Sequence, residues 1–248
     1  METNRLSEGD QVRYERQMMI EGWGEEGQLR LKQSKVFVAG AGGLGSPVSI
    51  YLAVAGVGQI TICDADRIEL SNLNRQILHP SERLGQSKAV SAGETLRALN
   101  PAIEVITLSD YVDGDNVERV VGQPDVVVDC LDNYETRYLL NSYCLERDIP
   151  FVHGAIEGLL GQVSFLHPPR TPCLRCLFPE APPRRPFPVL GATPGVIGCI
   201  QAMEVLKYLA GVGTTLSGRL LIFEGEEMAF TPIVVERVPS CPACGHLA

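Results

Sequence analysis

A glycine-rich run spans residues 40–45, and its four glycines are Gly40, Gly42, Gly43 and Gly45. Glycines let a chain turn tightly and approach a phosphate, whose charge is met by free N–H groups and by the positive end of a following helix. Asp64 stands 19 residues beyond Gly45, where a carboxylate can accept hydrogen bonds from ribose hydroxyls. The pattern predicts an adenine-nucleotide site; the alternative is a tight strand-to-helix turn without a ligand.

A polar segment follows Asp64 and supplies groups suited to a nucleotide with several phosphates. Its candidate binding residues are Asp66, Ser71, Asn72, Asn74, Arg75, Gln76 and Lys88. Lys88 lies in the first turn of a predicted helix, where an exposed cation opposes the helix dipole by about 0.3–1 kcal/mol. A bound polyphosphate would explain that lysine, and a solvated lysine is the alternative; for Arg75 the alternative is a surface ion pair. Glycines alone do not distinguish NAD from ATP, whereas these cations favour ATP.

Asp132 and Asn133 come shortly after the apolar run at residues 125–129. Ligands of open α/β sheets collect at the carboxyl ends of the strands, and Mg²⁺ binds through carboxylates and substrate phosphates. Asp132 is therefore a candidate magnesium ligand, with Asn133 beside it. The alternative is that Asp132 caps the next helix and Glu135 completes a capping box.

Two C-x-x-C pairs supply four thiolates, from Cys173, Cys176, Cys241 and Cys244. Four thiolates form a closed tetrahedral zinc site of the structural kind. The pairs are separated by 64 residues, far more than in a zinc finger, so this site would tie the C-terminus back onto the domain. Disulfides or free thiols are the alternatives, and a reducing compartment favours the metal.

Predicted strands and helices alternate around these residues. Strands are expected at Lys35–Ala39, Gln59–Cys63, Glu104–Leu108 and 125–129, and helices at 47–55, 87–99 and 133–146, after a helical arm at 13–20 and 27–32. Ser46 is expected to cap the helix at 47–55. After Pro150 we expect a strand at 161–166, a proline-rich loop at 179–188, a helix at 195–210 and a hairpin of 219–223 with 228–235.

These elements predict an α/β fold: a Rossmann-like parallel sheet with an N-terminal helical arm, C-terminal antiparallel strands and a structural zinc site. The expected organisation is a single domain over residues 1–248. Its nucleotide-binding half would cover 13–150, and 151–248 would be the half held by zinc.

Composition narrows the function. Hydrophobic residues make up 45% and charged residues 21% of the 248 residues, which is globular composition. The formal charge of −9 without a basic stripe argues against a nucleic-acid partner. We expect no membrane span, because no apolar run approaches about 20 residues. Residues 1–11 are polar and show no export signal, so we expect a cytoplasmic protein.

Several of these motifs together resemble the MoeB/ThiF/HesA family of adenylyltransferases, which are related to ubiquitin-activating enzymes. The resemblance rests on the RYERQ arm at residues 13–17, the GAGGLG loop, LSNLNRQ, Lys88, DCLDN and both cysteine pairs. It runs from about Arg13 to Gly245, nearly the whole chain.

The resemblance implies that ATP adenylates the Gly-Gly C-terminus of a small ubiquitin-like sulfur carrier, MoaD- or ThiS-like, with Mg²⁺ present. Molybdenum cofactor and thiamine biosynthesis are the pathways it suggests. Gly43 would line the phosphate loop, Asp64 would hold the ribose and Asp132 the magnesium. Arg16 would reach the partner's site in a homodimer, and 151–248 would bind the carrier. The implied catalytic set is Arg16, Arg75, Lys88 and Asp132.

One departure concerns covalent catalysis. Some relatives carry a cysteine in the loop that crosses the active site, but residues 177–194 contain none. The nearest thiol, Cys199, is expected to be a packing residue. We therefore expect adenylation alone, with sulfur delivered by a separate donor protein. Two rival functions are a nicotinamide oxidoreductase and a non-catalytic module of this fold that binds a ubiquitin-like protein.

Overall fold

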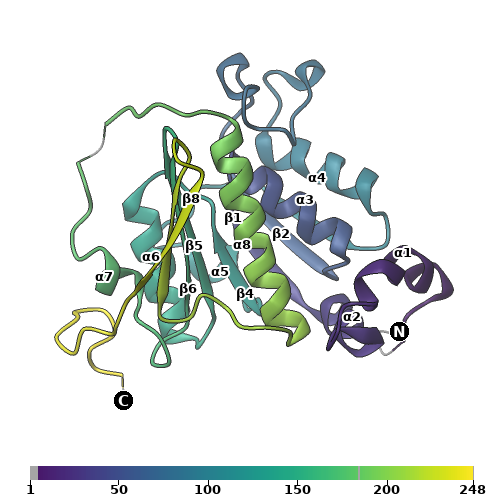
Figure 1. Ribbon diagram of the computed structural model, residues 1–248. Helices are drawn as coiled ribbons and strands as arrows, with labels where there is room; N and C mark the ends of the chain where they lie inside the picture. The colour runs from purple at the N-terminus through teal and green to yellow at the C-terminus, as the bar shows by residue number, and fades with distance from the viewer. Residues whose placement is uncertain (1–4, 184, 248) are drawn as a thin grey trace.

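A single sheet of eight strands organises the chain, in the order β3-β2-β1-β4-β5-β6-β7-β8 (Figure 1). The computed structural model describes residues 5–183 and 185–247, so Arg184 of the proline-rich loop lies outside the described residues. The strands are β1 (Lys35–Ala39), β2 (Gln59–Cys63), β3 (Glu104–Leu108), β4 (Val126–Asp129), β5 (Phe151–Glu157), β6 (Leu160–Leu166), β7 (Arg219–Glu224) and β8 (Ala229–Val234). Pairing is parallel from β3 through β5 and antiparallel from β5 to β8.

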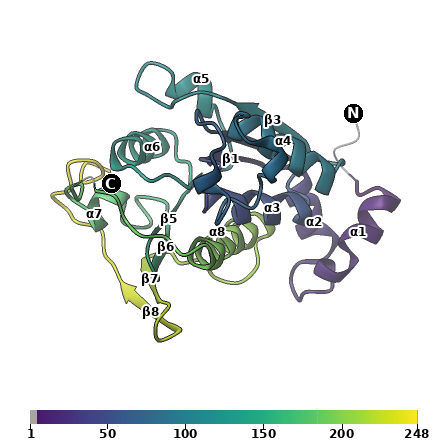
Figure 2. The ribbon, with the colours of Figure 1, turned by 90° about the horizontal axis from the view of Figure 1, so that it is seen from above.

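Helices cover both faces of this sheet, and two further helices form the N-terminal arm. They are α1 (Glu8–Met18), α2 (Gly24–Gln33), α3 (Gly45–Ala55), α4 (Lys88–Leu99), α5 (Val117–Val121), α6 (Tyr134–Glu146), α7 (Leu174–Leu177) and α8 (Ala192–Ala210). Figure 2 shows α8 and α6 on opposite sides of the sheet. None of the described helices combines the length and the apolar character needed to cross a bilayer.

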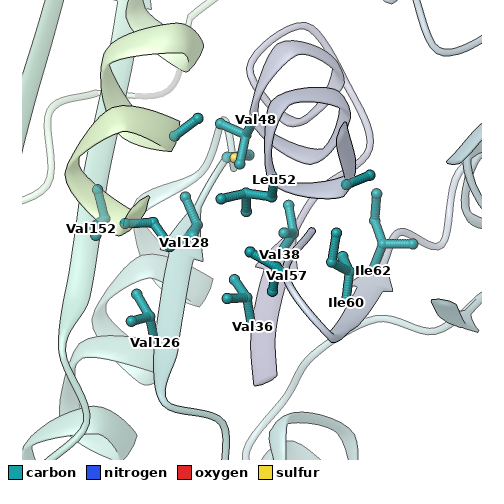
Figure 3. Close-up of a cluster of buried hydrophobic side chains, with 14 of the residues drawn as sticks. Val36, Val38, Val48, Leu52, Val57, Ile60, Ile62, Val126, Val128 and Val152 are labelled. Carbon is teal, nitrogen blue, oxygen red and sulfur yellow. The ribbon is translucent and has the colours of Figure 1, made fainter. Parts of the chain in front are cut away.

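Strand residues alternate between two cores, as expected for a sheet buried on both faces. Val36 and Val38 of β1 join the core beneath α3, α4 and α8, whereas Phe37 joins the core beneath α5, α6 and α7. Figure 3 shows the first core, where Val48 and Leu52 of α3 lie over side chains from β1, β2 and β4. These cores fix the carboxyl ends of the parallel strands relative to one another.

The N-terminal arm packs against the far ends of two sheet-covering helices. The Tyr14 hydroxyl accepts a hydrogen bond of 2.8 Å from Asn100, just beyond α4, and Gln17 donates one of 2.8 Å to the carbonyl of Ala55 at the end of α3. The arm is therefore attached to the C-terminal ends of α3 and α4. The residues that begin those helices lie at the other end.

One local expectation was wrong, one alternative is excluded, and three elements, α5, α7 and β5, were not expected. Ser46 does not cap a helix, because α3 begins at Gly45 and the Ser46 hydroxyl bonds back to the carbonyl of Gly42 inside the first turn. Asp132 does not cap α6; Asn133 does, by accepting a 2.9 Å hydrogen bond from Thr136 N–H. Strand β5 was missed, although its pairing with β4 and β6 joins the parallel and antiparallel parts of the sheet.

Candidate active site

The predicted nucleotide residues gather where the strand order reverses. The chain leaves β1 towards β2 and β3 and returns at β4, so the carboxyl ends of β1 and β4 form the crevice that binds ligands in such sheets. The glycine loop follows β1, and Asp132 follows β4. The two segments touch, because Gly40 has φ +101° and a Cβ there would lie 2.7 Å from the carbonyl oxygen of Cys130.

The four glycines fall into two groups. Gly40 and Gly45 are buried, and a Cβ on Gly45 would collide with the Gly40 carbonyl, so both are needed for the turn itself. Gly42 and Gly43 are half-buried and form the open side of the loop. Pro194 of α8 and the aliphatic part of Arg75 border Gly43. A phosphate could approach the loop on this open side.

The peptide groups of Ala41 hold the loop from beneath. Its N–H donates to the Asp64 carboxylate over 2.8 Å, and its carbonyl accepts a 2.8 Å hydrogen bond from Nε2 of His79. Because a carbonyl only accepts, this bond places the His79 proton on Nε2, and Nδ1 then accepts from the Ser91 hydroxyl 3.1 Å away. Burial lowers the pKa of His79, so the neutral ring is favoured. No motif in the sequence marks His79 as a site residue.

Asp64 lies at the end of β2 and is partly buried. Its second oxygen accepts a 2.9 Å bond from the N–H of Asp66. Burial raises the pKa of the Asp64 carboxyl, an effect that the nearby Lys88 ammonium opposes. The carboxylate has lone pairs left for ribose hydroxyls.

Lys88 begins α4 and is buried, which excludes the alternative of a solvated lysine. Its ammonium lies 2.8 Å from the Asp66 carboxylate. The alternative for Arg75, a surface ion pair, is also excluded, because Arg75 makes no ion pair with the described residues. Its guanidinium donates to the Ser71 carbonyl over 2.9 Å and to the Asn74 side chain over 2.8 Å. Arg75 borders Gly43, and Lys88 lies near Asp64, which bonds Ala41 of the glycine loop.

The remaining polar residues of this segment have different roles. The Asn72 side chain accepts a 3.1 Å bond from the N–H of Glu69 and shapes the turn. Ser71 and Asn74 are exposed. The Gln76 carboxamide is buried beside Gly42, and its oxygen has no hydrogen-bond partner in the described parts of the chain. That oxygen is a buried acceptor, so it can bond only a group that donates a hydrogen, which phosphate oxygens do not.

Asp132 is exposed at the sheet edge and forms no hydrogen bond or ion pair with the residues that the structure describes. Because Asn133 caps α6, the Asp132 carboxylate is not used to begin the helix. The donor fits a magnesium ion, which prefers carboxylate and phosphate oxygens. The ion itself would be brought with the phosphates.

Arg16 is not brought together with the other predicted residues. It is exposed near the end of α1, which packs on the C-terminal ends of α3 and α4, whereas the glycine loop and Lys88 lie at their N-terminal ends. A helix of the length of α3 spans ~16 Å. Arg16 therefore lies well away from the site of its own chain.

The chain between α7 and α8 passes over the same end of the sheet (Figure 1). The Gly158 N–H donates a 2.7 Å bond to the Pro188 carbonyl, and Arg185 pairs with Glu157 at 2.7 Å, so this loop is attached to the β5–β6 turn. Cys199 follows on α8 and is half-buried, and burial raises the pKa of its thiol.

The four predicted metal-ligating cysteines do come together. Their sulfur atoms all lie within 4.8 Å of one another, including pairs at 3.4, 3.6 and 3.9 Å. Four thiolates around a tetrahedral zinc, each at about 2.3 Å, would place sulfurs about 3.8 Å apart. The cluster joins α7 to the C-terminal loop, which Figure 1 shows beside it. Its geometry can hold a metal ion.

Comparisons with known proteins show the family of this chain. The model of the ThiF family matches residues 14–243. The chain is 47% identical over 240 residues to the SAMP-activating enzyme E1 of Haloferax volcanii, covering 94% of this chain and 88% of that protein. It is 43% identical over 244 residues to the sulfur carrier protein adenylyltransferase of Thermus thermophilus, covering 94% and 90%.

Among solved structures, that of E. coli MccB with ATP has a TM-score of 0.85 at 24% identity, over 97% of this chain and 76% of that one. This likeness concerns the fold. From the matched family model and the two relatives, this chain belongs to the ThiF family.

Proposed function

We propose that this protein is an adenylyltransferase that uses ATP to activate the C-terminal Gly-Gly carboxylate of a small ubiquitin-like sulfur carrier and releases pyrophosphate. The observation that carries this proposal is that the glycine loop touches Cys130, two residues before Asp132, at one sheet edge, while Arg75 borders Gly43 and Lys88 lies near Asp64, which bonds the loop. The relatives' names, a sulfur carrier protein adenylyltransferase and a SAMP-activating enzyme E1, support it.

In this proposal, ATP lies along the reversal of the strand order. The half-exposed Gly42 and Gly43 admit its phosphates, and Asp64 accepts hydrogen bonds from the ribose. Arg75 and Lys88 face the phosphate chain, and the exposed side chains of Ser71 and Asn74 lie on the same segment. Two buried residues of that segment, Asn72 and Gln76, shape it from below.

Asp132 would hold Mg²⁺ together with the phosphates. The ion, when bound, neutralises phosphate charge and stabilises the charge that develops on the departing pyrophosphate. Asn133 lies next to it and also caps α6, so the position of Asp132 is tied to the start of a helix.

The reaction needs little proton transfer. A C-terminal carboxylate has an ordinary pKa of about 3.3–3.7, so it is ionised at neutral pH and needs no general base. One carboxylate oxygen forms a bond to the α-phosphorus as the bond to the bridging oxygen of pyrophosphate breaks. Two anions approach each other in this step, and Arg75 and Lys88 reduce their repulsion and orient the phosphates.

The second half of the chain would bind the carrier. Strand β8 ends the sheet and exposes apolar side chains, among them Phe230, Ile233 and Val234. Pro232 sits in the middle of β8 and blunts pairing with another strand. Binding there would therefore rely on apolar side-chain contacts, and the carrier's tail would extend from β8 towards the glycine loop.

The proposal includes zinc in the four-cysteine cluster, because its sulfur separations fit a tetrahedral thiolate site. That site would fix the C-terminal loop to α7 and leaves no open position for catalysis. Four thiolates suit a reducing compartment, so the proposal also includes a cytoplasmic location. Sulfur would come from a separate donor protein.

A homodimer completes the proposed site. Arg16 is exposed, has no partner among the described residues, and cannot reach the site of its own chain across the length of α3. Its guanidinium would enter the phosphate site of a second copy. No other residue of the arm is proposed to act there.

The deciding experiment is ATP–pyrophosphate exchange with purified protein, Mg²⁺ and a panel of Gly-Gly-ended carriers. We expect exchange that depends on one carrier, is lost in Asp132→Ala and is kept in Glu146→Ala, a control at the far end of α6. No exchange with any carrier, despite measurable ATP binding, would favour the non-catalytic binding module. A change in nicotinamide absorbance with turnover would favour the oxidoreductase.

A further inference from the structure

A buried ion pair lies directly behind the sheet edge that carries Asp132. Asp129, the last residue of β4, is fully buried, and the Arg137 side chain on α6 is 4% exposed. The Arg137 Nε lies 3.2 Å from one carboxylate oxygen of Asp129 and 3.3 Å from the other. The pair is not part of the phosphate or carrier contacts proposed above.

Stability alone does not explain this pair. Removing two charges from water costs several kcal/mol each, and replacing a buried ion pair with apolar residues of similar volume is often neutral or stabilising. Asp129 ends a strand that is otherwise all valine, in a region where apolar side chains would pack well. The polar groups that the pair contacts therefore indicate what the pair does.

Those contacts converge on one short segment of backbone. The Asp129 carboxylate accepts a 3.1 Å bond from the N–H of Leu131, and the Arg137 guanidinium donates to the Leu131 carbonyl. Both polar groups of Leu131 are thus held by the same ion pair. Because the Leu131 carbonyl belongs to the peptide that joins Leu131 to Asp132, this contact sets the direction in which Asp132 leaves the sheet.

Other buried groups fix the pair itself. His153 on β5 donates from Nδ1 to Asp129 over 2.7 Å, and its Nε2 lies 3.3 Å from the Gln162 amide nitrogen. Gln201 on α8 donates to the Asp129 carbonyl over 2.8 Å. Burial favours the neutral carboxyl, but Arg137 and His153 outweigh it and hold the pKa of Asp129 below its usual value. The pair stays ionised and its geometry is constrained from three elements.

We propose that Arg137 and Asp129 are positioning residues that orient Asp132 towards the metal and phosphates by holding the Leu131–Asp132 peptide. The inference rests on the proposed function, in which Asp132 holds Mg²⁺. On the other side of Asp132, Asn133 is fixed as the cap of α6. The exposed carboxylate of Asp132 therefore lies between two immobilised neighbours, Leu131 and Asn133. Neither Arg137 nor Asp129 touches the substrate.

The test measures the ATP affinity of the protein with Mg²⁺ and with EDTA. The affinity with Mg²⁺ divided by the affinity with EDTA is called the metal ratio. Arg137→Lys keeps the charge but cannot bond Asp129 and Leu131 together. Loss of groups that hold metal ligands costs about 10–100-fold in metal affinity, so we expect the metal ratio to fall most of the way to its value in Asp132→Ala. ATP affinity in EDTA should stay unchanged.

A double-mutant cycle separates positioning from general damage. If Arg137 acts through Asp132, Arg137→Lys has no further effect on the metal ratio in an Asp132→Ala background. Arg147→Lys makes the same substitution at the residue that follows α6, where Arg147 stacks on Tyr143 at the other end of the helix, and should change nothing. Circular dichroism and gel filtration confirm folding; where Arg137→Lys does not fold, His153→Gln should lower the metal ratio by a smaller factor.

Three results would overturn the inference. A folded Arg137→Lys or His153→Gln with the metal ratio of the wild type would show that the pair does not position Asp132. Effects of Arg137→Lys and Asp132→Ala that simply add would assign Arg137 a separate role. If Asp132→Ala itself leaves the metal ratio and exchange unchanged, the metal role in the proposed function fails first and the inference falls with it.

Discussion

The Lys88 ammonium lies 2.8 Å from the Asp66 carboxylate at the start of α4, and the Lys88 backbone N–H donates to the Asp66 carbonyl over 2.9 Å. The lysine side chain is 8% exposed and the aspartate side chain 56%, so the pair opens to solvent on its anionic side. Asp66 thus offsets the unfavourable position of a cation in a first helical turn. A polyphosphate at the glycine loop would add negative charge next to the same ammonium.

Substitution of Lys88 should therefore impair chemistry more than folding. Lys88→Met keeps most of the apolar volume and leaves Asp66 hydrated, so we expect little change in melting temperature. Loss of one group that stabilises developing charge costs about 100-fold in kcat, and we expect that decrease in carrier-dependent exchange. Lys35→Met, at the exposed start of β1, is the matched control. Exchange within a factor of about 2 of the wild type would remove Lys88 from the catalytic set.

His79 should make the stability of the protein pH-dependent. Its pKa is lowered by burial and by the nearby charges of Lys88 and Arg83, against the hydrogen bond to Ala41, which raises it. A histidine with a depressed pKa in the folded state takes up its proton more readily when unfolded. The folded state therefore loses stability as pH falls through the ordinary value of 6.5 and towards the folded pKa.

The matching variant is His79→Gln, whose carboxamide can donate to the Ala41 carbonyl and does not titrate. We expect it to be less stable than the wild type at neutral pH, with the difference in unfolding free energy shrinking as pH falls below 6.5. Chemical denaturation at fixed protein concentration measures this. His153 also has a lowered pKa and contributes to the slope of both proteins, so only the difference between them is diagnostic. A difference that is constant or grows on acidification would contradict the assignment.

The sequence predicted most elements that depend on local patterns. Strands β1, β2 and β3 were predicted at their observed bounds because runs that contain β-branched residues end at turn-forming residues: Gly40 after β1, Asp64 after β2 and Ser109 after β3. Strand β5 was missed because its sequence, FVHGAIE, contains a histidine and a glycine in its middle. Only the fold explains this histidine and this glycine. His153 bonds Asp129, and a Cβ on Gly154 would collide with the Gln201 side chain.

For the candidate site too, residues whose roles depend on contacts made in the folded chain could not be predicted. Glycine spacing and the acid after β2 pointed to residues that do come together, since Asp64 accepts a bond from the Ala41 N–H, and the cysteine pairs located the cluster. His79 was not found because it bonds the Ala41 carbonyl, which is 38 residues away in sequence. Arg137 was not found because no pattern in its helix shows that its side chain turns inward to Asp129 and Leu131. A polar residue ending an all-valine strand, Asp129, was the available signal for the buried pair.

The cysteine cluster should hold a metal that stabilises the C-terminal loop. We expect one zinc per chain in purified protein and its loss in Cys244→Ser, measured by elemental analysis. Each 1 kcal/mol lost lowers the melting temperature by about 2–4 °C for a protein of this size, so a clear decrease is expected. Cys199→Ser, outside the cluster, should keep the metal. Full metal content in Cys244→Ser would exclude a four-thiolate site.

Cys199 should not form a covalent bond to the carrier. Burial raises the pKa of its thiol, which keeps the nucleophilic thiolate scarce. We expect Cys199→Ala to retain wild-type exchange, and no carrier adduct to be seen by intact-mass spectrometry under non-reducing conditions. An adduct that is present in the wild type and disappears in Cys199→Ala would contradict adenylation alone and assign this thiol a role in sulfur transfer.

Arg16 provides a test of the homodimer that needs no structure of the complex. Arg16→Ala and Asp132→Ala should each be inactive in exchange. In a mixed dimer, the site with an intact Asp132 receives Arg16 from the Asp132→Ala partner and is complete, whereas the other site lacks both groups. Random reassortment gives mixed dimers as half of the population, with one working site in each.

Mixing the two variants after mild dissociation should therefore restore about a quarter of wild-type exchange. A mixture of Arg16→Ala with Arg16→Ala/Asp132→Ala is the control and should stay inactive, because no chain then supplies Arg16. Each possible result has a distinct meaning. Recovery requires Arg16 to act across the dimer. No recovery, with mixed dimers demonstrated by native mass spectrometry, would place the function of Arg16 within its own chain, against the position of α1 at the far ends of α3 and α4.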